Sequence, residues 1–241
     1  MSMFPDFSKR SSAIEIMDDL NCSGDVLHQT LRELDSINHF LGGNTVTLQG
    51  LNDLLKINNL NRSVHVIDIG CGSGEMLKQI AKHFRKTNPH STFIGIDANQ
   101  NIAQYAQQLV AKFPEISIIA EDILGDNFRV KKFDIALATL FLHHFPSSQL
   151  IDIFRNLKHQ ARIGIVINDL HRHWLAYYSI KLLTTLFSKS SMVKFDAPLS
   201  VLRGFTKKEL IEILKQAGIE NYSLKWKWAF RWQLIISHQK P

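Results

Sequence analysis

The stretch Asp68-Ile-Gly-Cys-Gly-Ser-Gly-Glu75 decides the fold of this chain of 241 residues. It ends a short β-branched run, residues 64–69, and precedes a segment of helical periodicity that extends to Phe84. Three glycines at alternate positions allow positive φ and a close approach of the backbone to a ligand. The helix that follows points its N-terminal amides at an anion. The turn therefore predicts a ligand site at the edge of an open α/β sheet.

Strands and helices alternate along the rest of the chain, which predicts right-handed crossovers and a parallel sheet. Two strand-like runs near the C-terminus are separated by almost nothing and predict an antiparallel pair at the sheet edge. Besides 64–69, we expect strands over 92–96, 116–119, 133–138, 162–167, 222–228 and 230–237. We expect a short helix capped by Ser11-Ser12 and longer helices over 25–40, 47–57, 75–84, 99–113 and 206–217, and one after Pro146.

Composition excludes several classes of protein. Hydrophobic residues make up 45% of the chain and charged residues 21%, which is typical of a soluble globular protein. Cys22 and Cys71 stand in unrelated contexts, so we expect no structural disulfide and a reducing compartment, the cytoplasm. The net charge of +6 is not concentrated in a basic stripe, so a nucleic-acid partner is disfavoured. The N-terminus has no secretory pattern, and the apolar run 174–187 is too short and too polar for stable membrane insertion.

The residues around the turn indicate the ligand. A phosphate-binding loop would need Gly-Lys-Ser/Thr, and a dinucleotide fingerprint would need G-x-G-x-x-G; this turn is neither. Asp97 ends the second strand, where its carboxylate can accept hydrogen bonds from both hydroxyls of a ribose. Asp122 follows the third strand, and its carboxylate can accept a hydrogen bond from the amino group of an adenine. Ala98 and Ile123 can flank the adenine ring.

These motifs, in this order, resemble the class I S-adenosylmethionine-dependent methyltransferases. The resemblance covers roughly residues 60–170 and rests on 66–74, 95–97, 121–123 and 133–145. It implies a Rossmann-like seven-stranded sheet of order 3-2-1-4-5-7-6, with its last strand antiparallel and helices on both faces. It implies S-adenosylmethionine as cofactor and S-adenosylhomocysteine as product. The cofactor site that we predict comprises Asp68, Gly70, Cys71, Gly72, Gly74, Asp97, Ala98, Asp122, Ile123, Thr139 and Leu140.

The resemblance also disfavours three kinds of methyltransferase within the family. Family enzymes that methylate base amines carry Asn/Asp-Pro-Pro-aromatic after the fourth strand, where this chain has Thr139-Leu-Phe-Leu. No cysteine lies where a cytosine-C5 enzyme needs its nucleophile. Metal-dependent catechol-type enzymes need an acidic residue at the position of Thr139, so we predict no metal site.

His143 and His144 are the candidate bases, because removing a hydroxyl proton near neutral pH suits an imidazole. Their place past the fourth strand resembles that of the catalytic histidine in plant-type phenolic O-methyltransferases. Asp169 ends the adjacent strand and could orient the imidazole. The structural alternative is that both histidines cap the next helix and pack beneath the cofactor. The segment His171-Arg-His173 could contribute a second base or an anion contact.

We expect an N-terminal helical cap over 1–60 and a methyltransferase domain over 61–241 with an insertion at 171–205. The insertion could be a lid over an apolar acceptor, a packing element or a membrane contact. The alternating Trp226, Trp228, Phe230 and Trp232 are expected to pack against the sheet. The function predicted is methyl transfer to a small aromatic or lipophilic acceptor at oxygen, of natural-product or quinone type. An RNA methyltransferase and a non-catalytic cofactor-binding regulator are the alternatives, and a homodimer is left open.

Overall fold

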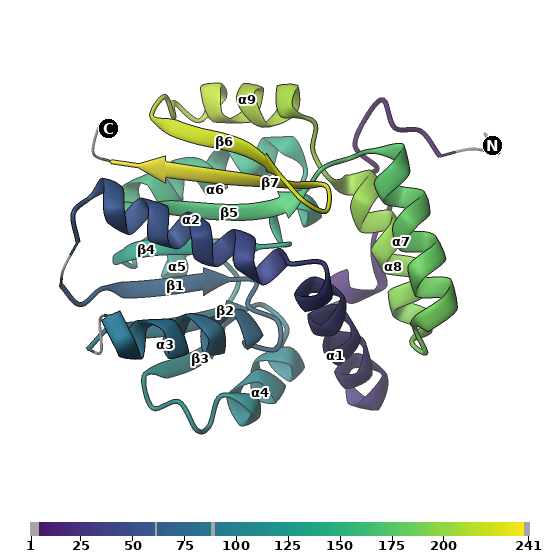
Figure 1. The fold of residues 1–241 in the computed structure, drawn as a ribbon, viewed down its shortest axis with the longest axis horizontal. Coiled ribbons are helices and arrows are strands. Elements are labelled where there is room, and N and C mark those ends of the chain that lie inside the picture. The colour runs from purple at the N-terminus through teal and green to yellow at the C-terminus, as the bar shows by residue number, and fades with distance from the viewer. Residues whose placement is uncertain (1–4, 61, 88–89, 239–241) are drawn as a thin grey trace.

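The structure is a computed structural model that describes residues 5–60, 62–87 and 90–238. Within these residues, seven strands form one sheet of order β3-β2-β1-β4-β5-β7-β6 (Figure 1). This order confirms the expected fold class. The strands are β1 (His65–Ile69), β2 (Thr92–Asp97), β3 (Ile116–Ala120), β4 (Phe133–Thr139), β5 (Ala161–Leu170), β6 (Tyr222–Lys227) and β7 (Arg231–Ser237).

The pairing explains how one end of the sheet collects functional residues. The strands β3, β2, β1, β4 and β5 pair in parallel, so their carboxyl ends share one edge. The last strand, β7, is antiparallel to β5 and to β6. It lies between them, so the hairpin inserts its second strand into the sheet and leaves β6 at the border. The residues that precede β7 therefore reach the same edge as the residues that end β4 and β5.

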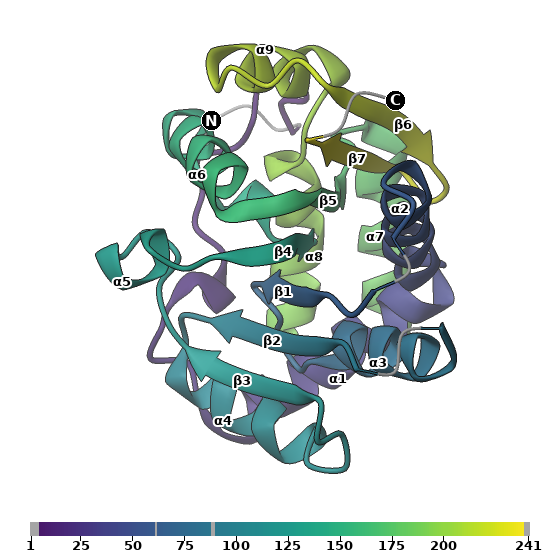
Figure 2. The ribbon, with the colours of Figure 1, turned by 90° about the vertical axis from the view of Figure 1, so that its left-hand side faces the viewer.

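Helices cover both faces of the sheet, with α2 and α3 on one face and α5 and α6 on the other (Figure 2). Ile135 and Leu137 of β4 pack into the cluster of α2 and α3, while Ala136 and Ala138 pack into the opposite cluster. Burial on both faces explains the nearly continuous apolar composition of the central strands. The helices around the sheet are α2 (Gly43–Ile57), α3 (Glu75–Thr87), α4 (Gln100–Leu109), α5 (Asp126–Arg129), α6 (Ser147–Gln160) and α9 (Lys207–Gln216).

Beyond the carboxyl ends of the strands, the insertion and the N-terminal region lie side by side. Residues 171–205 form the helices α7 (Trp174–Phe187) and α8 (Ser191–Arg203), which pack against each other. The helix α8 also contacts α1 (Gly24–Phe40) and the short 3-10 helix η1 (Ile16–Asp18). Figure 1 shows α1, α7 and α8 grouped at this end of the molecule.

Several local predictions need correction. The short N-terminal helix is η1, which begins at Ile16 and is not capped by Ser11 or Ser12. The backbone amide of Ser11 instead donates to the carbonyl of Leu202, which ties the segment to α8. The helix α2 begins at Gly43, directly after α1, and α4 ends at Leu109.

The aromatic residues of the hairpin do not all pack against the sheet. Trp232 is buried, but Trp226 and Trp228 expose 47% and 71% of their surface. The packing prediction is therefore wrong for these two residues, because they lie on β6 and in the turn rather than on the inner strand β7.

The insertion helix α7 leaves a large part of its apolar surface uncovered. Its exposed side chains are Trp174, Leu175, Tyr178, Leu182, Leu186 and Phe187. In the described residues, no helix combines the length and the apolar character that crossing a bilayer requires.

Candidate functional site

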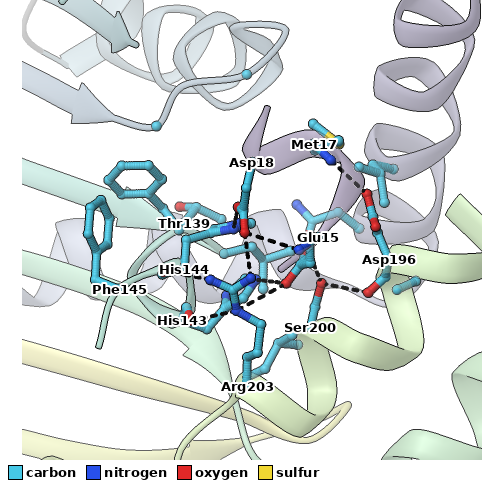
Figure 3. Close-up of a pocket in the computed structure, with 18 of the residues that line it drawn as sticks. Glu15, Met17, Asp18, Thr139, His143, His144, Phe145, Asp196, Ser200 and Arg203 are labelled. Carbon is cyan, nitrogen blue, oxygen red and sulfur yellow. Dashed lines mark hydrogen bonds and ion pairs between the residues drawn. The ribbon is translucent and has the colours of Figure 1, made fainter. Parts of the chain in front are cut away.

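A cavity of about 1150 Å³ lies at the carboxyl edge of the sheet, and the Gly-rich turn, α1, α7, α8 and the β6–β7 turn contribute to its lining. Figure 3 shows the part of the cavity where residues of the N-terminal segment, the β4–α6 connection and α8 meet. The predicted residues that line the cavity are Asp68, Gly70, Cys71, Gly72, Asp97, Ala98, Asp122, Ile123, Thr139, Leu140, His143 and His144. Gly74 and Asp169 are not among the lining residues.

The glycines of the turn have the backbone geometry that the sequence predicted. Gly70, Gly72 and Gly74 have φ of +67°, +52° and +74°. A Cβ atom at Gly70 would lie 2.0 Å from the ring of Phe141, so no other residue fits there without moving that ring. The amide of Gly70 donates to the carbonyl of Ile96, which joins the turn to β2.

Two aspartates, Asp68 and Asp97, lie next to this turn. Asp68 is buried, and its Oδ1 has no hydrogen-bond partner among the described residues. Burial and the nearby charge of Asp97 raise the pKa of Asp68 to about 7. Burial also raises the pKa of Asp97, although its Oδ2 accepts from the Gly72 amide at 3.2 Å and its Oδ1 from the Asn99 amide at 3.0 Å. The charge of His144 opposes this shift of the Asp97 pKa only in part, and neither carboxylate forms an ion pair with another described residue.

The remaining predicted residues line the cavity along the ends of β2, β3 and β4. Ala98 and Asp122 are exposed, and Ile123 is buried. Asp122 Oδ1 accepts from the backbone amide of Leu124 at 2.9 Å. Thr139 Oγ1 lies 2.9 Å from the hydroxyl of Thr47 on α2, and Leu140 adopts a positive φ of 55°.

His143 and Asp169 form a buried pair. Nδ1 of His143 lies 2.7 Å from Oδ1 of Asp169, and the His143 amide donates to Oδ2 at 3.2 Å. Burial opposes ionisation of Asp169, but the charge of His143 and these hydrogen bonds outweigh it and lower the pKa of Asp169. An ionised carboxylate only accepts hydrogen bonds, so Nδ1 carries the proton and Nε2 is left as the basic atom of the ring.

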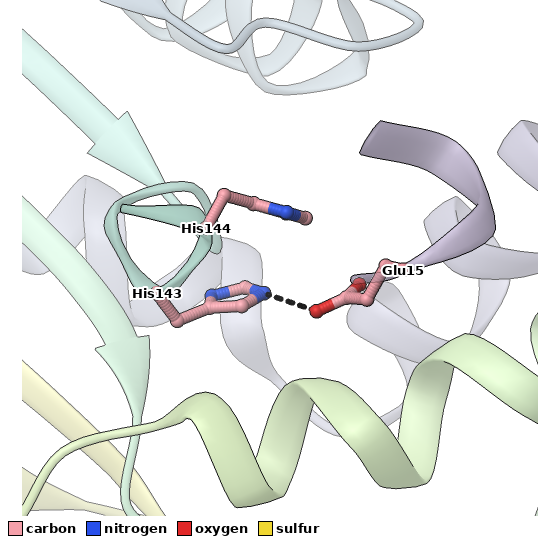
Figure 4. Close-up of side chains that lie close together, drawn as sticks. All are labelled: Glu15, His143 and His144. Atoms are coloured by element: carbon pink, nitrogen blue, oxygen red, sulfur yellow. Dashed lines mark ion pairs between the residues drawn. The ribbon is translucent and has the colours of Figure 1, made fainter. Parts of the chain in front are cut away.

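Sequence reasoning missed Glu15, which faces that basic atom. Its Oε1 lies 3.8 Å from Nε2 of His143 and has no hydrogen-bond partner among the described residues (Figure 4). Its Oε2 accepts from the hydroxyl of Ser200 at 2.8 Å. Burial raises the pKa of Glu15 to about 7, against the effects of His144, Ser200 and Arg203. Glu15 is therefore a second proton-binding group beside His143.

His144 has a different environment from His143. Its Nδ1 lies 2.5 Å from Oδ1 of Asp18, and Oδ2 of Asp18 accepts from Nη1 of Arg203 at 2.5 Å (Figure 3). Burial opposes the charge of Asp18, but His144 and Arg203 outweigh it and lower the pKa of Asp18. His144 is therefore held in an ion-pair network between η1 and α8.

Residues 66–164 match a family model described as a methyltransferase domain. The match covers less than half of the chain and supports the class I S-adenosylmethionine-dependent methyltransferase family that the sequence resembles. The chain is therefore a methyltransferase enzyme, and its cofactor is S-adenosylmethionine. The family predicted from the sequence is confirmed. A search of curated proteins found no match for this methyltransferase.

Solved structures share the fold of this methyltransferase at low sequence identity. A plantazolicin methyltransferase in complex with S-adenosylhomocysteine is 18% identical, with a TM-score of 0.67 over 89% of this chain and 95% of that chain. A methyltransferase from Aquifex aeolicus is 16% identical, with a TM-score of 0.60 over 89% and 98% of the two chains. Human N-acetylserotonin methyltransferase is 15% identical, with a TM-score of 0.59 over 88% of this chain and 56% of that chain.

One cluster of the methyltransferase has the spacing of metal ligands. Glu15, His143 and His144 each offer one ligand atom, and these atoms lie within 4.8 Å of one another. The sequence predicted no metal site here, and the cluster depends on a residue that sequence reasoning did not consider. Nε of Arg203 lies 3.6 Å from Oε1 of Glu15, so a guanidinium cation already occupies the neighbourhood of this carboxylate.

The sequence offered few signals for the additional residues of this methyltransferase. Glu15, Asp18 and Arg203 belong to segments without strand or helix motifs of the family. The one available signal was the pair of acidic residues beside apolar Ile16 and Met17, which could have indicated a short segment with one buried face.

Proposed function

We propose that this methyltransferase transfers the methyl group to a hydroxyl oxygen of a small aromatic or lipophilic acceptor, with His143 as general base. The observation that carries the proposal is the buried pair of His143 and Asp169 beside the cavity. Asp169 holds the proton on Nδ1 and orients the ring, so Nε2 can accept the hydroxyl proton. His144 is the second candidate for this role.

The residues of the Gly-rich turn fit S-adenosylmethionine. The unpartnered Oδ1 of Asp68 leaves a buried acceptor for a ligand donor, and the missing Cβ atoms at the turn permit close approach. We assign the methionine part to Asp68, Gly70, Cys71, Gly72, Gly74, Thr139 and Leu140. We assign the ribose to Asp97, and the adenine to Ala98, Asp122 and Ile123. The cofactor, when bound, supplies an electrophilic methyl group.

The rest of the cavity supports an apolar acceptor. Its lining beyond the turn includes the side chains Leu34, Ile37, Leu41, Ile180, Leu183, Trp228 and Phe230. Pockets of this composition bind ligands through burial of apolar surface, while a few polar groups fix the orientation. The walls come from α1, α7 and the β6–β7 turn, so we assign acceptor specificity to the N-terminal helices and the insertion.

The chain's own residues would move one proton in this reaction. The acceptor hydroxyl loses its proton to Nε2 of His143, and its oxygen takes the methyl group. The protonated imidazole is stabilised by ionised Asp169, which already accepts from Nδ1. Glu15 lies next to Nε2 and could receive the proton afterwards, because its pKa is about 7.

A direct experiment tests this function. Purified protein is incubated with S-adenosylmethionine and a panel of phenols, each paired with the aniline of the same skeleton, and S-adenosylhomocysteine and methylated products are measured by mass spectrometry. We expect methyl ethers from at least one phenol and no methylated anilines. Methylation of added RNA, or binding of S-adenosylhomocysteine without turnover of any small molecule, would contradict the proposal.

A further inference from the structure

Arg231 is a buried cation at the edge of the acceptor cavity. It begins β7, pairs with Leu170 at the end of β5, and exposes only 2% of its surface. Within the sheet its side chain shares a face with Gln233, which donates to α2 at the carbonyl of Val46. Arg231 is one of the residues that line the cavity.

The guanidinium of Arg231 has no adequate partner in the described part of the chain. Its Nε and Nη1 are buried without any hydrogen bond, and none of the ion pairs between described residues includes Arg231. Burial lowers the pKa of Arg231 to about 10, and the charge of Asp169 partly opposes this effect. Asp169 is already engaged by the ring of His143 and by two backbone amides.

The surroundings of Arg231 are otherwise neutral. A Cβ atom at Gly43 would lie 2.7 Å from Cζ of Arg231 and 2.0 Å from Oδ1 of Asn38, so the guanidinium and this amide both pack against the glycine. Nδ2 of Asn44, another lining residue, also has no hydrogen-bond partner. Buried charges in proteins are normally paired. The acceptors Oδ1 of Asn38 and Oε1 of Gln233 also have no hydrogen-bond partner, but neither carries a charge. The guanidinium therefore lacks a counter-charge, which an anion bound in the cavity would supply.

The position of Arg231 separates it from the turn where we place the cofactor. The turn follows β1, and three strand steps lead from β1 through β4 and β5 to β7. Neighbouring strands are about 4.8 Å apart, so these steps amount to about 14 Å. An anion at Arg231 would thus lie on the acceptor side of the cavity, near Trp228 and Phe230, and not at the Gly-rich turn.

We propose that Arg231 binds a carboxylate of the methyl acceptor, so that the substrates of this enzyme are acidic, apolar molecules. The inference rests on the proposed small-molecule function and specifies its substrate class. A carboxylate matches the planar guanidinium and accepts hydrogen bonds only, as the unpaired donors of Arg231 and Asn44 require. The apolar walls would bind the body of the same molecule.

The test compares acidic ligands with uncharged ligands of the same shape. Wild-type protein saturated with S-adenosylhomocysteine is titrated by calorimetry with 4-hydroxycinnamate and with 4-hydroxycinnamamide, and with benzoate and benzamide. The variants are Arg231→Met, which removes the charge, Arg231→Lys, and the control Lys225→Met, which removes a charge from exposed β6. Thermal unfolding of each variant without ligand checks that it is folded.

For wild type and Lys225→Met, we expect at least one acid to bind about 10- to 100-fold more tightly than its amide, as expected for hydrogen bonds to a charged group. Arg231→Met should lose this preference and Arg231→Lys should keep part of it. All variants should keep the affinity for S-adenosylhomocysteine.

Equal binding of acids and amides by wild type, with S-adenosylhomocysteine still bound, would overturn the assignment of Arg231 and leave the proposed function intact. A selective loss of S-adenosylhomocysteine affinity in Arg231→Met would also overturn it, by giving the guanidinium to the cofactor carboxylate. Failure of wild type to bind S-adenosylhomocysteine would contradict the proposed function itself.

Discussion

Oε1 of Glu15 lies 3.8 Å from Nε2 of His143, although one residue belongs to the N-terminal segment and the other follows β4. The opposite atom of the same ring, Nδ1, is bound to Asp169. The imidazole therefore lies between two carboxyl groups, one ionised and one with a pKa of about 7. This arrangement separates a residue that orients the ring from a residue that can exchange protons with it.

Replacement of His143 by Ala should lower turnover with a phenolic acceptor about 10²- to 10⁴-fold, because general base catalysis contributes that much. The affinity for S-adenosylhomocysteine should stay near the wild-type value, as measured by calorimetry. His90→Ala, at an exposed position, is the control. A loss of less than about tenfold would indicate that alignment of the reactants drives the transfer and would move the role of base away from His143.

Replacement of Asp97 by Ala should weaken S-adenosylmethionine binding by roughly 1–3 kcal/mol, because the ribose hydroxyls would lose their acceptor. Equilibrium binding by calorimetry measures this change. Asp126→Ala removes a carboxylate whose side chain is 97% exposed and should leave the affinity unchanged. Equal affinities of the two variants would exclude Asp97 from the ribose site.

Glu15 should make the folded state less stable as pH rises. Its pKa is raised from 4.5 to about 7 in the fold, so between these values the native state binds more protons than the unfolded state. The free energy of unfolding then falls as pH rises through this window and levels off above pH 7. Glu15→Gln should match wild type near pH 4.5 and be more stable at pH 8, by up to about 3 kcal/mol.

Urea denaturation from pH 4.5 to 8 checks this prediction for Glu15. The exposed Glu220→Gln serves as control, because its side chain gains little by losing a charge. A stability difference between Glu15→Gln and wild type that does not change with pH would show that folding does not raise the pKa of Glu15.

Removal of metal ions should leave turnover unchanged. We assign Nε2 of His143 to the proton of the acceptor, and a metal ion held by Glu15, His143 and His144 would occupy that atom. Steady-state assays before and after dialysis against a chelator measure the effect. Activity that disappears with the chelator and returns with a divalent ion would make the three residues a metal centre.

The insertion should close over the acceptor. Hydrogen exchange of residues 174–203 should slow when S-adenosylhomocysteine and an acidic phenol are both present, because the lining residues of α7 and α8 would lose their contact with water. Exchange within α9, which contributes no residue to the lining of the cavity, provides the internal control. Unchanged exchange in α7 and α8 would assign the insertion to packing rather than to a lid.

The sheet and the Gly-rich turn were predictable because their signals are local. The turn at residues 70–74 lies between a strand and a helix, and the parallel strands contain runs of β-branched and apolar residues. Glu15 and Arg231 were not predictable in this way. Their positions beside the cavity depend on contacts between segments that are distant in sequence. In a sequence alone, an acidic or basic residue usually indicates a solvated surface.

The pairing of Asp18 with Arg203 also sets an order for assembly during synthesis. The two residues are 185 positions apart in the chain. At about 5–20 residues per second, a ribosome adds Arg203 roughly 10–40 s after Asp18. During that interval neither the guanidinium nor the helix α8 that packs on η1 exists. The N-terminal segment therefore has no partner for Asp18 until most of the sheet has been translated, and the wall of the cavity that it forms stays incomplete until then.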